Sequence, residues 1–533
     1  MTKRLATVAV VAVGLTLLLA SSGSTRAIKD GGTFRVGIPA SFVPSVDAIL
    51  ESNLLISRAT CASLMAVPDK ASSEVSSMIP EIAAGDPVIS ADGKTYTVAI
   101  RKGLRFSTGA PVTARDVVHT INRMLSKKMD SPIAPIFSDI VGAQAVIDGK
   151  AETASGVSAR AGALTIRLER PQGDFTTRMT NLCVVPRTLP IDPEGARAPV
   201  PTAGPYYVAQ YVSGLSAVLE RNPYYRGARP HHVDRFVIDL SHDAQTVLDR
   251  VDSGQLDYGF VPNQVYAPRA AEFTKKYGVN KSRFFAVPGT FIRMFVLNTS
   301  SPLFRNNVEL RQAVNFAADR RALLAERGPL AGYLTDQFLY PGLLGFRNDR
   351  IYPLKAPNLR KASLLAKGRT RGGKAVLYVP DTPVTQAQAQ ILQYDLAKIG
   401  LKVDIEAFPA PVLFEKLATP GEPFDIGWIG WGGEPGDPGL MLSPLFDGRT
   451  IGQQGFQDYS YFDSARYNRR LDHASTLIGQ ARYQAYGELD VQLSRDAAPA
   501  IPYAYDRTMN LVSQRTGCVV LNPNLDLAAV CLK

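Results

Sequence analysis

The segment from Phe424 to Leu440, FDIGWIGWGGEPGDPGL, constrains the fold more than any other part of this 533-residue chain. Its first half predicts a buried strand, because large apolar side chains occupy both faces with almost nothing polar between them. Its second half cannot continue that strand, since glycine and proline recur from Gly432 to Gly439. Ligands of open α/β sheets bind where strands end, so this loop is a candidate ligand site. A glycine-rich turn that merely closes a core strand is the alternative.

Residues 1–27 have the three-part layout of a secretory signal peptide. Lys3 and Arg4 precede an uncharged run from Leu5 to Ala20, and a short polar stretch leads to a predicted cleavage point after Ala27. A retained membrane anchor is the alternative, although a run of about 16 apolar residues is short for a span. Ser22 stands where a lipoprotein leader carries its lipid-bearing cysteine, so we expect export without lipidation there.

Four cysteines, without C-x-x-C spacing, agree with an oxidising compartment. Cys518 and Cys531 bracket a short C-terminal loop, which favours a disulfide between them and leaves Cys61 to pair with Cys183. Two other connectivities, or four buried free thiols, remain open at this point.

The formal net charge is +11, and removal of the three basic residues in the leader leaves +8. Basic residues are scattered along the chain without a block of five or six, so we predict a solvated surface and no nucleic-acid partner.

Hydrophobic periodicity predicts an α/β chain. Alternation indicates early strands around Phe34–Ile38 and Tyr96–Ile100, and Thr113 with Asp116 forms a capping box that begins a helix. Further on, the pattern predicts one helix over Val308–Leu324. A strand at 375–379, a helix at 386–399 and a strand at 403–407 then predict a mixed or parallel sheet in a second lobe.

Catalytic signatures are missing from the sequence. There is no G-x-S-x-G, H-E-x-x-H or G-x-G-x-x-G, and the G-x-x-x-x-G-K at Gly368 to Lys374 is followed by Ala375 where a hydroxyl must reach magnesium. The histidine group His231, His232 and His242 is more typical of a surface turn than of a metal site. We therefore predict no enzyme, no metal and no cofactor.

Several blocks, in order, carry a family resemblance. Pro80-Glu81-Ile82-Ala83, the stretch Ser90 to Arg105 and Asp116 resemble the P-E-x-A…S-x-D-G-x-T-Y-T-x-x-L-R-x-G-x-x-F…T-A-x-D-V core of the extracellular solute-binding proteins of the dipeptide/oligopeptide class (family 5), which serve ABC importers. Further blocks at 203–207, 219–225, 297–320 and 431–438 extend the likeness over essentially the whole mature chain.

The resemblance implies a type II periplasmic-binding fold, with two α/β lobes joined by a hinge plus an extra subdomain. It implies a lobe I made of residues 28–65, 187–290 and 505–533, a subdomain of residues 66–186 inserted in lobe I, and a lobe II of residues 291–504. It also implies a monomer that closes on a peptide ligand and delivers it to the permease subunits of an ABC transporter in the periplasm or outside the cell.

The resemblance also implies ligand-binding residues. Family members place an aspartate three positions after the tryptophan of a W-x-x-D loop, where it pairs with the peptide ammonium, and Glu434 occupies that position here. The longer side chain departs from the pattern, because it keeps the charge but moves the carboxylate by one methylene. The residues expected to line the cleft are Glu434, Trp431, Gly432, Gly433, Asp437, Arg58 and Tyr503.

Two other functions stay open. The same fold could bind a non-peptide solute such as a nickel chelate, haem, an opine or an oligosaccharide. An exported hydrolase would need a nucleophile and a base that the sequence does not offer.

Overall fold

The structure is a computed structural model that describes residues 30–50, 53–71, 75, 78–432, 437–453 and 456–533. The predicted leader, Gly433 and Glu434 lie outside these residues. Within the described ranges, none of the helices has both the length and the apolar character needed to span a bilayer.

Lobe I is the part of the chain built on a five-stranded sheet of order β11-β1-β10-β9-β8. Phe34 and Val36 of β1 are buried on one face, as the alternation predicts. β1 pairs in parallel with β10 and β11, whereas β9 pairs antiparallel with β10 and β8. The strands are β1 (Thr33–Gly37), β8 (Tyr206–Val212), β9 (Ser216–Arg221), β10 (Arg235–Asp239) and β11 (Tyr258–Gly259). The helices of lobe I are α1 (Leu54–Thr60), α5 (Ala244–Asp252), α6 (Asn263–Tyr266) and α7 (Ala270–Tyr277).

The subdomain is an antiparallel four-stranded sheet packed on short helices, with its own hydrophobic core. Its strands are β4 (Val88–Ile89), β5 (Thr95–Ala99), β6 (Val157–Arg160) and β7 (Ala163–Arg167), and its helices are α2 (Ala114–Leu125), α3 (Ala143–Ile147) and α4 (Phe175–Arg178). The predicted capping box is confirmed at the start of α2, where the Thr113 N–H donates to Asp116 Oδ2 at 2.9 Å. A small pair, β2 (Met65–Ala66) with β3 (Ile79–Pro80), joins the subdomain to lobe I.

Lobe II is built on a six-stranded sheet of order β13-β17-β12-β16-β14-β15. β14 pairs in parallel with β15 and β16, and β16 pairs antiparallel with β12, so the predicted mixed sheet is confirmed. The strands are β12 (Phe284–Leu297), β13 (Gly332–Leu334), β14 (Lys374–Pro380), β15 (Lys402–Phe408), β16 (Ile426–Gly432) and β17 (Ala500–Leu511). β16 is the strand predicted from the Phe424 segment.

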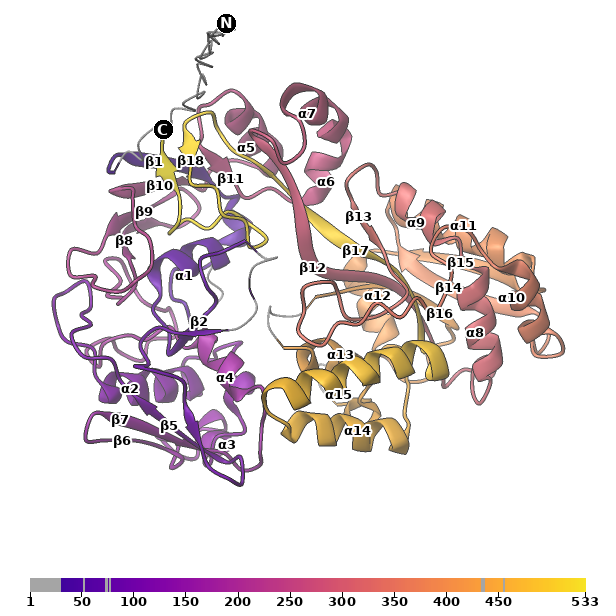
Figure 1. Ribbon diagram of the computed structural model, residues 1–533, viewed down its shortest axis with the longest axis horizontal. Helices are drawn as coiled ribbons and strands as arrows, with labels where there is room; N and C mark the ends of the chain where they lie inside the picture. The colour runs from indigo at the N-terminus through magenta and orange to yellow at the C-terminus, as the bar shows by residue number, and fades with distance from the viewer. Residues whose placement is uncertain (1–29, 51–52, 72–74, 76–77, 433–436, 454–455) are drawn as a thin grey trace, which may run out of the picture.

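Helices cover both faces of the lobe II sheet. One hydrophobic cluster joins the sheet to α8 (Val308–Ala317), α9 (Arg320–Ala325), α10 (Leu359–Ala366) and α11 (Pro383–Ala397). The other joins it to α12 (Ala410–Leu417), α13 (Gly439–Phe446), α14 (Ala465–Thr476) and α15 (Gly479–Gln492). Figure 1 shows α13, α14 and α15 as a group beside the subdomain helices α3 and α4.

The single helix predicted over Val308–Leu324 is wrong, because the structure has two helices there. α8 ends at Ala317, and Ala318 adopts an extended backbone. The Asp319 carboxylate then accepts the Ala322 N–H at 3.0 Å and caps α9. The apolar periodicity runs through both helices, whereas the break depends on this local cap.

The strands β12 and β17 connect the two lobes. They pair antiparallel from Phe284↔Leu511 to Val296↔Ala500, and both cross the middle of the molecule in Figure 1. The pairing shifts register between Pro288 and Ile292, so residues 289–291 form a bulge between the lobes. The lobe boundaries given above, at 290/291 and 504/505, stay predictions.

Both favoured disulfides are confirmed. Cys61 is bonded to Cys183 across 122 residues of sequence, which ties the end of α1 to the end of the subdomain. Cys518 is bonded to Cys531 across 13 residues, beside the small pair β18 (Thr516–Gly517) and β19 (Cys531–Leu532).

Two buried carboxyl groups make the stability of lobe II depend on pH. Burial raises the pKa of Asp458 to about 8, and Ser460 Oγ donates to its Oδ1 at 2.6 Å. Burial likewise raises the pKa of Asp490 to about 7. The folded state therefore holds protons that the unfolded chain releases near its ordinary value of 3.8, and stability is lost as pH rises through these values.

We predict that Asp458→Asn removes part of this pH dependence. The free energy of unfolding of the parent should fall between pH 5 and pH 8, whereas the variant should match it near pH 5 and exceed it at pH 8 by on the order of 1 kcal/mol. Asp490 still titrates in the variant, so its free energy of unfolding should also fall as pH rises, but less steeply than that of the parent. Urea unfolding followed at both pH values measures this, and identical slopes for the two proteins would contradict the assignment.

Candidate functional site

A cleft of about 1430 Å³ lies between the lobes and is bounded by the β12–β17 bulge. Arg58, Glu81, Arg229 and the Cys61–Cys183 disulfide line it from the lobe I side. Gly289, Thr290, Phe291, Arg293 and Asp506 line it at the bulge, and Arg327, Thr382, Thr385, Trp428 and Gly432 line it from lobe II. This volume is above the range typical of drug-sized ligand pockets, so it has room for a short peptide or a larger cofactor-sized solute.

A buried ion-pair network forms the lobe I wall. The Arg229 guanidinium donates to both oxygens of Asp69 at 2.8 to 3.2 Å and lies 3.5 Å from Glu81 Oε1. Arg229 Nη2 also donates to the backbone carbonyl of Arg58 at 2.7 Å. Burial opposes the charge of Asp69, but Arg229 outweighs burial and keeps its pKa below the ordinary value. Burial raises the pKa of Glu81, so Arg229 and Asp69 are the fixed charges of this network.

Arg58, a predicted site residue, lies in this wall. Its Nη1 donates to the Asn522 carbonyl at 2.9 Å, and its Nη2 lies 3.5 Å from Asp526 Oδ2. Burial, reinforced by Asp69, raises the pKa of Asp526. Arg58 lines the cleft with a side chain that is 18% exposed, and its contact with a ligand stays a prediction.

Trp428 and Tyr503 form one hydrogen-bonded group at the lobe II wall. The Trp428 indole N–H lies 3.2 Å from both Gln388 Oε1 and the Tyr503 hydroxyl oxygen. The Tyr503 hydroxyl donates to the same Gln388 oxygen at 3.3 Å. Tyr503 itself is fully buried, and burial raises its pKa. Among the described residues it is thus Trp428 that lines the cleft, with Tyr503 behind it.

Trp431 and Gly432 end β16. Gly432 lines the cleft opposite Phe291, and a Cβ there would stand 2.8 Å from the phenyl ring. Trp431 is half-buried against the cluster that joins the sheet to α12–α15. Within the described part of the chain, its indole N–H has no hydrogen-bond partner. The ligand contacts predicted for Trp431, Gly433 and Glu434 stay predictions.

Asp437 has a partner from the protein itself. Arg482 of α15 donates to both of its carboxylate oxygens at 2.8 Å, and both side chains are 2% exposed. Asp437 Oδ1 also accepts the Gly439 N–H at 2.7 Å, which anchors the start of α13. A ligand contact by Asp437 stays a prediction, and the structure adds a positioning role at the end of the glycine-rich loop.

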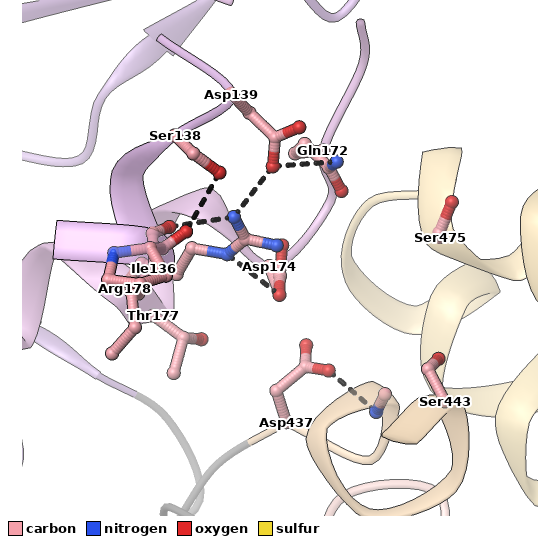
Figure 2. Close-up of polar contacts among 12 residues, drawn as sticks. Ile136, Ser138, Asp139, Gln172, Asp174, Thr177, Arg178, Asp437, Ser443 and Ser475 are labelled. Atoms are coloured by element: carbon pink, nitrogen blue, oxygen red, sulfur yellow. Dashed lines mark hydrogen bonds and ion pairs between the residues drawn. The ribbon is translucent and has the colours of Figure 1, made fainter. Parts of the chain in front are cut away.

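The lobes also touch on the side formed by α4 and α15. The Gly173 N–H of the subdomain donates to the Ser475 carbonyl of lobe II at 2.8 Å, and Arg482 Nη1 donates to the same carbonyl at 2.9 Å. Figure 2 shows Gln172 and Asp174 on the subdomain facing Ser475, Ser443 and Asp437 on lobe II. Arg178 fixes this edge of the subdomain by donating to Asp174 and Asp139 at 3.0 and 2.9 Å. Backbone contact thus joins the two lobes at this edge.

Among the described residues, six charged residues line the cleft that the sequence analysis did not predict, namely Glu81, Arg229, Arg293, Glu326, Arg327 and Asp506. One signal was available, because Arg293 is the one charged side chain in the otherwise apolar run FIRMFVL. A charged residue in a buried strand needs a partner or a ligand. The partner, Asp506, is 213 residues away in sequence.

Comparison with known proteins assigns the family. The model described as "Bacterial extracellular solute-binding proteins, family 5 Middle" matches residues 77–453, more than half of the chain. The chain belongs to this family. Members bind solutes, peptides among them, for ABC transporters and work extracellularly or in the periplasm.

Two of the relatives described below are named after a cargo, one after haem and one after an oligopeptide. This family 5 protein is 26% identical over 437 residues to Protein XP55 of Streptomyces lividans, covering 78% of this chain and 74% of that one. It is 27% identical over 472 residues to Heme-binding protein A of Haemophilus influenzae, covering 82% of this chain and 80% of that protein. The solved structure of "Clavulanic acid biosynthesis oligopeptide binding protein 2" superposes with a TM-score of 0.84 at 23% identity, covering 95% and 96%, which confirms the predicted type II fold.

We predict that Gly173→Ala disturbs closure of the cleft. A Cβ at Gly173 would stand 1.8 Å from the Leu477 carbonyl oxygen, which is backbone and cannot rotate away, so the lobes must separate locally. Small-angle X-ray scattering should give a larger radius of gyration for this variant than for the parent. Gly85→Ala is the matched control, because a Cβ there meets nothing within 4 Å. Superimposable scattering curves for Gly173→Ala and the control would contradict the role of this contact.

Proposed function

We propose that this family 5 protein is the exported solute receptor of an ABC importer, and that it captures short peptides in the cleft and delivers them to a permease. The observation that carries this proposal is the cleft of about 1430 Å³ between two lobes that touch at both the β12–β17 pair and the Gly173–Ser475 contact. We further propose a monomer without catalytic activity, secreted by a cleaved, non-lipidated leader into the periplasm or beyond.

Peptide binding would combine main-chain hydrogen bonds at the end of β16 with an ion pair to Glu434. A peptide laid along the end of β16 gains main-chain hydrogen bonds that do not depend on its sequence. Gly432 supports this arrangement, since it lines the cleft and leaves the backbone accessible. Glu434 would receive the peptide ammonium. Closing the lobes removes water from such a pair and strengthens it.

A non-peptide cargo is the second candidate. The similarity to Heme-binding protein A of Haemophilus influenzae, over 82% of this chain, favours this alternative specifically. The volume of the cleft accommodates either class of solute.

Tryptophan fluorescence tests the proposal. Trp428 and Trp431 are the two tryptophans of the chain, and Trp428 lines the cleft, so a bound peptide should change the emission intensity or wavelength. Titration with pools of di- to pentapeptides should give a saturable signal, and most of it should disappear in Trp428→Phe. Haem titrated in parallel distinguishes the two cargo classes. A signal with haem and none with any peptide pool would contradict peptide binding.

We predict that Glu434→Gln weakens peptide binding by one to several decades. Removal of one partner of a desolvated charge pair typically costs roughly 2 to 5 kcal/mol. The substitution keeps the size of the side chain and removes its charge. Glu415→Gln on the exposed face of α12 is the matched control. Isothermal titration calorimetry with a peptide selected from the pools measures both, and unchanged affinity in Glu434→Gln would overturn its assignment as the ammonium acceptor.

A further inference from the structure

We propose that Arg293 and Arg327 together bind a carboxylate of the ligand, which in a peptide is the C-terminal carboxylate. This inference rests on the proposed function, and it names the chemical group that the β12–β17 side of the cleft recognises.

Two guanidinium groups share one carboxylate at the bulge. Arg293 of β12 donates from Nε and Nη2 to Asp506 at 3.0 and 2.6 Å, and Arg327 Nη1 pairs with the other Asp506 oxygen. The three side chains carry two positive charges and one negative charge. All three line the cleft, with exposed fractions of 19% for Arg293, 14% for Arg327 and 9% for Asp506. Among the residues that the structure describes, one positive charge is therefore left without a counter-charge in a mostly desolvated place.

Donors remain free for a ligand. A guanidinium has five N–H groups in a planar fork. Among the described residues, Asp506 takes the Nε and Nη2 of Arg293 and the Nη1 of Arg327, and no residue accepts from Arg293 Nη1 or from Nε and Nη2 of Arg327. Such a fork matches the two oxygens of a carboxylate.

The surroundings hold Arg293 in place. Its guanidinium lies 5.5 Å from the ring centres of both Phe291 and Trp428, which restricts it and keeps water away from one side. Burial opposes its charge, but Asp506 outweighs burial and raises the pKa, so Arg293 stays charged. Glu326 also lines the cleft, but it is exposed and makes no ion pair with either arginine in the described part of the chain.

A purely structural role leaves the charge of one arginine unbalanced. Arg293 donates mainly to Oδ2 of Asp506 and Arg327 to Oδ1, so both oxygens are satisfied, but a carboxylate carries only one negative charge. A second buried cation adds a desolvation penalty that the fold does not recover by itself. A ligand carboxylate would recover it by completing a pattern of two arginines and two carboxylates.

The facing wall has the opposite balance. Arg58 and Arg229 stand there with Asp69, Glu81 and Asp526, which is two positive against three negative groups when all are ionised. Burial raises the pKa of Glu81 and of Asp526, so the lobe I wall becomes negative as both lose their protons, whereas the bulge stays positive. A solute that carries both a carboxylate and an ammonium group fits this distribution, and a free peptide is such a solute.

The test compares free-acid peptides with the same peptides amidated at the C-terminus. The parent protein should bind the free acids about ten- to a hundredfold more tightly, as expected for hydrogen bonds to a charged group. Arg327→Gln should lower the affinity for the free-acid peptides by a similar factor and leave the affinity for the amidated peptides nearly unchanged. We expect the same result for Arg293→Gln. Arg449→Gln is the matched control, because Arg449 also bridges two carboxylates, Asp447 and Asp472, but lies away from the cleft.

The outcomes distinguish the carboxylate anchor from the peptide cargo. The anchor is overturned if the parent binds free-acid and amidated peptides equally well. It is also overturned if both arginine variants bind the free-acid peptides as tightly as the parent does. The acid–amide comparison needs no variant, so it holds even if Arg293→Gln fails to fold. If the parent binds no peptide, the same comparison is made with haem and its dimethyl ester. Loss of haem binding in Arg327→Gln would then keep the anchor and reject peptide cargo, whereas no binding of any carboxylate probe would reject the anchor as well.

Discussion

The antiparallel pairing of β12 with β17 is the constraint on which the rest of the structure depends. The pair begins at Phe284↔Leu511 in the core of lobe I and ends at Val296↔Ala500 in the core of lobe II, so both lobes are built onto the same two strands. Because residues 289–291 interrupt the ladder, the connection is continuous but locally weaker between the lobes. The same interruption places Phe291, Arg293 and Asp506 at the cleft. The hinge and one wall of the binding site are therefore the same piece of chain.

Much of the fold follows from local sequence patterns. The strand β16, the capping box at Thr113 and the mixed sheet of lobe II are all confirmed, because each depends on residues close together in sequence. The disulfides Cys61–Cys183 and Cys518–Cys531 are also as predicted. The short loop between Cys518 and Cys531 favours that pair, and the two remaining cysteines can then bond only to each other. The helix break at Ala318 was missed, because apolar periodicity continues through it and only the Asp319 cap reveals it.

The site could be predicted only in part. Arg58 and Gly432 line the cleft, and the family likeness located them. The same likeness predicts a ligand contact for Tyr503, which is buried and hydrogen-bonded to the cleft residue Trp428, and that contact stays a prediction. Asp437 is bonded to Arg482, and Arg293 and Arg327 share Asp506. These pairings join residues 45 to 213 positions apart, so spacing and periodicity do not identify the partners, although the isolated charge of Arg293 in an apolar strand indicates that a partner is needed.

We propose that the two lobes enclose a small solute carried by this protein. A native mass spectrum of the protein, purified without denaturation from its own cells, shows whether such a solute is bound. We expect a species heavier than the mature chain by the mass of one small molecule, which dissociates on collisional activation and carries a carboxylate. A spectrum of the bare chain alone, unchanged after incubation with mixed peptides and with haem, would contradict it.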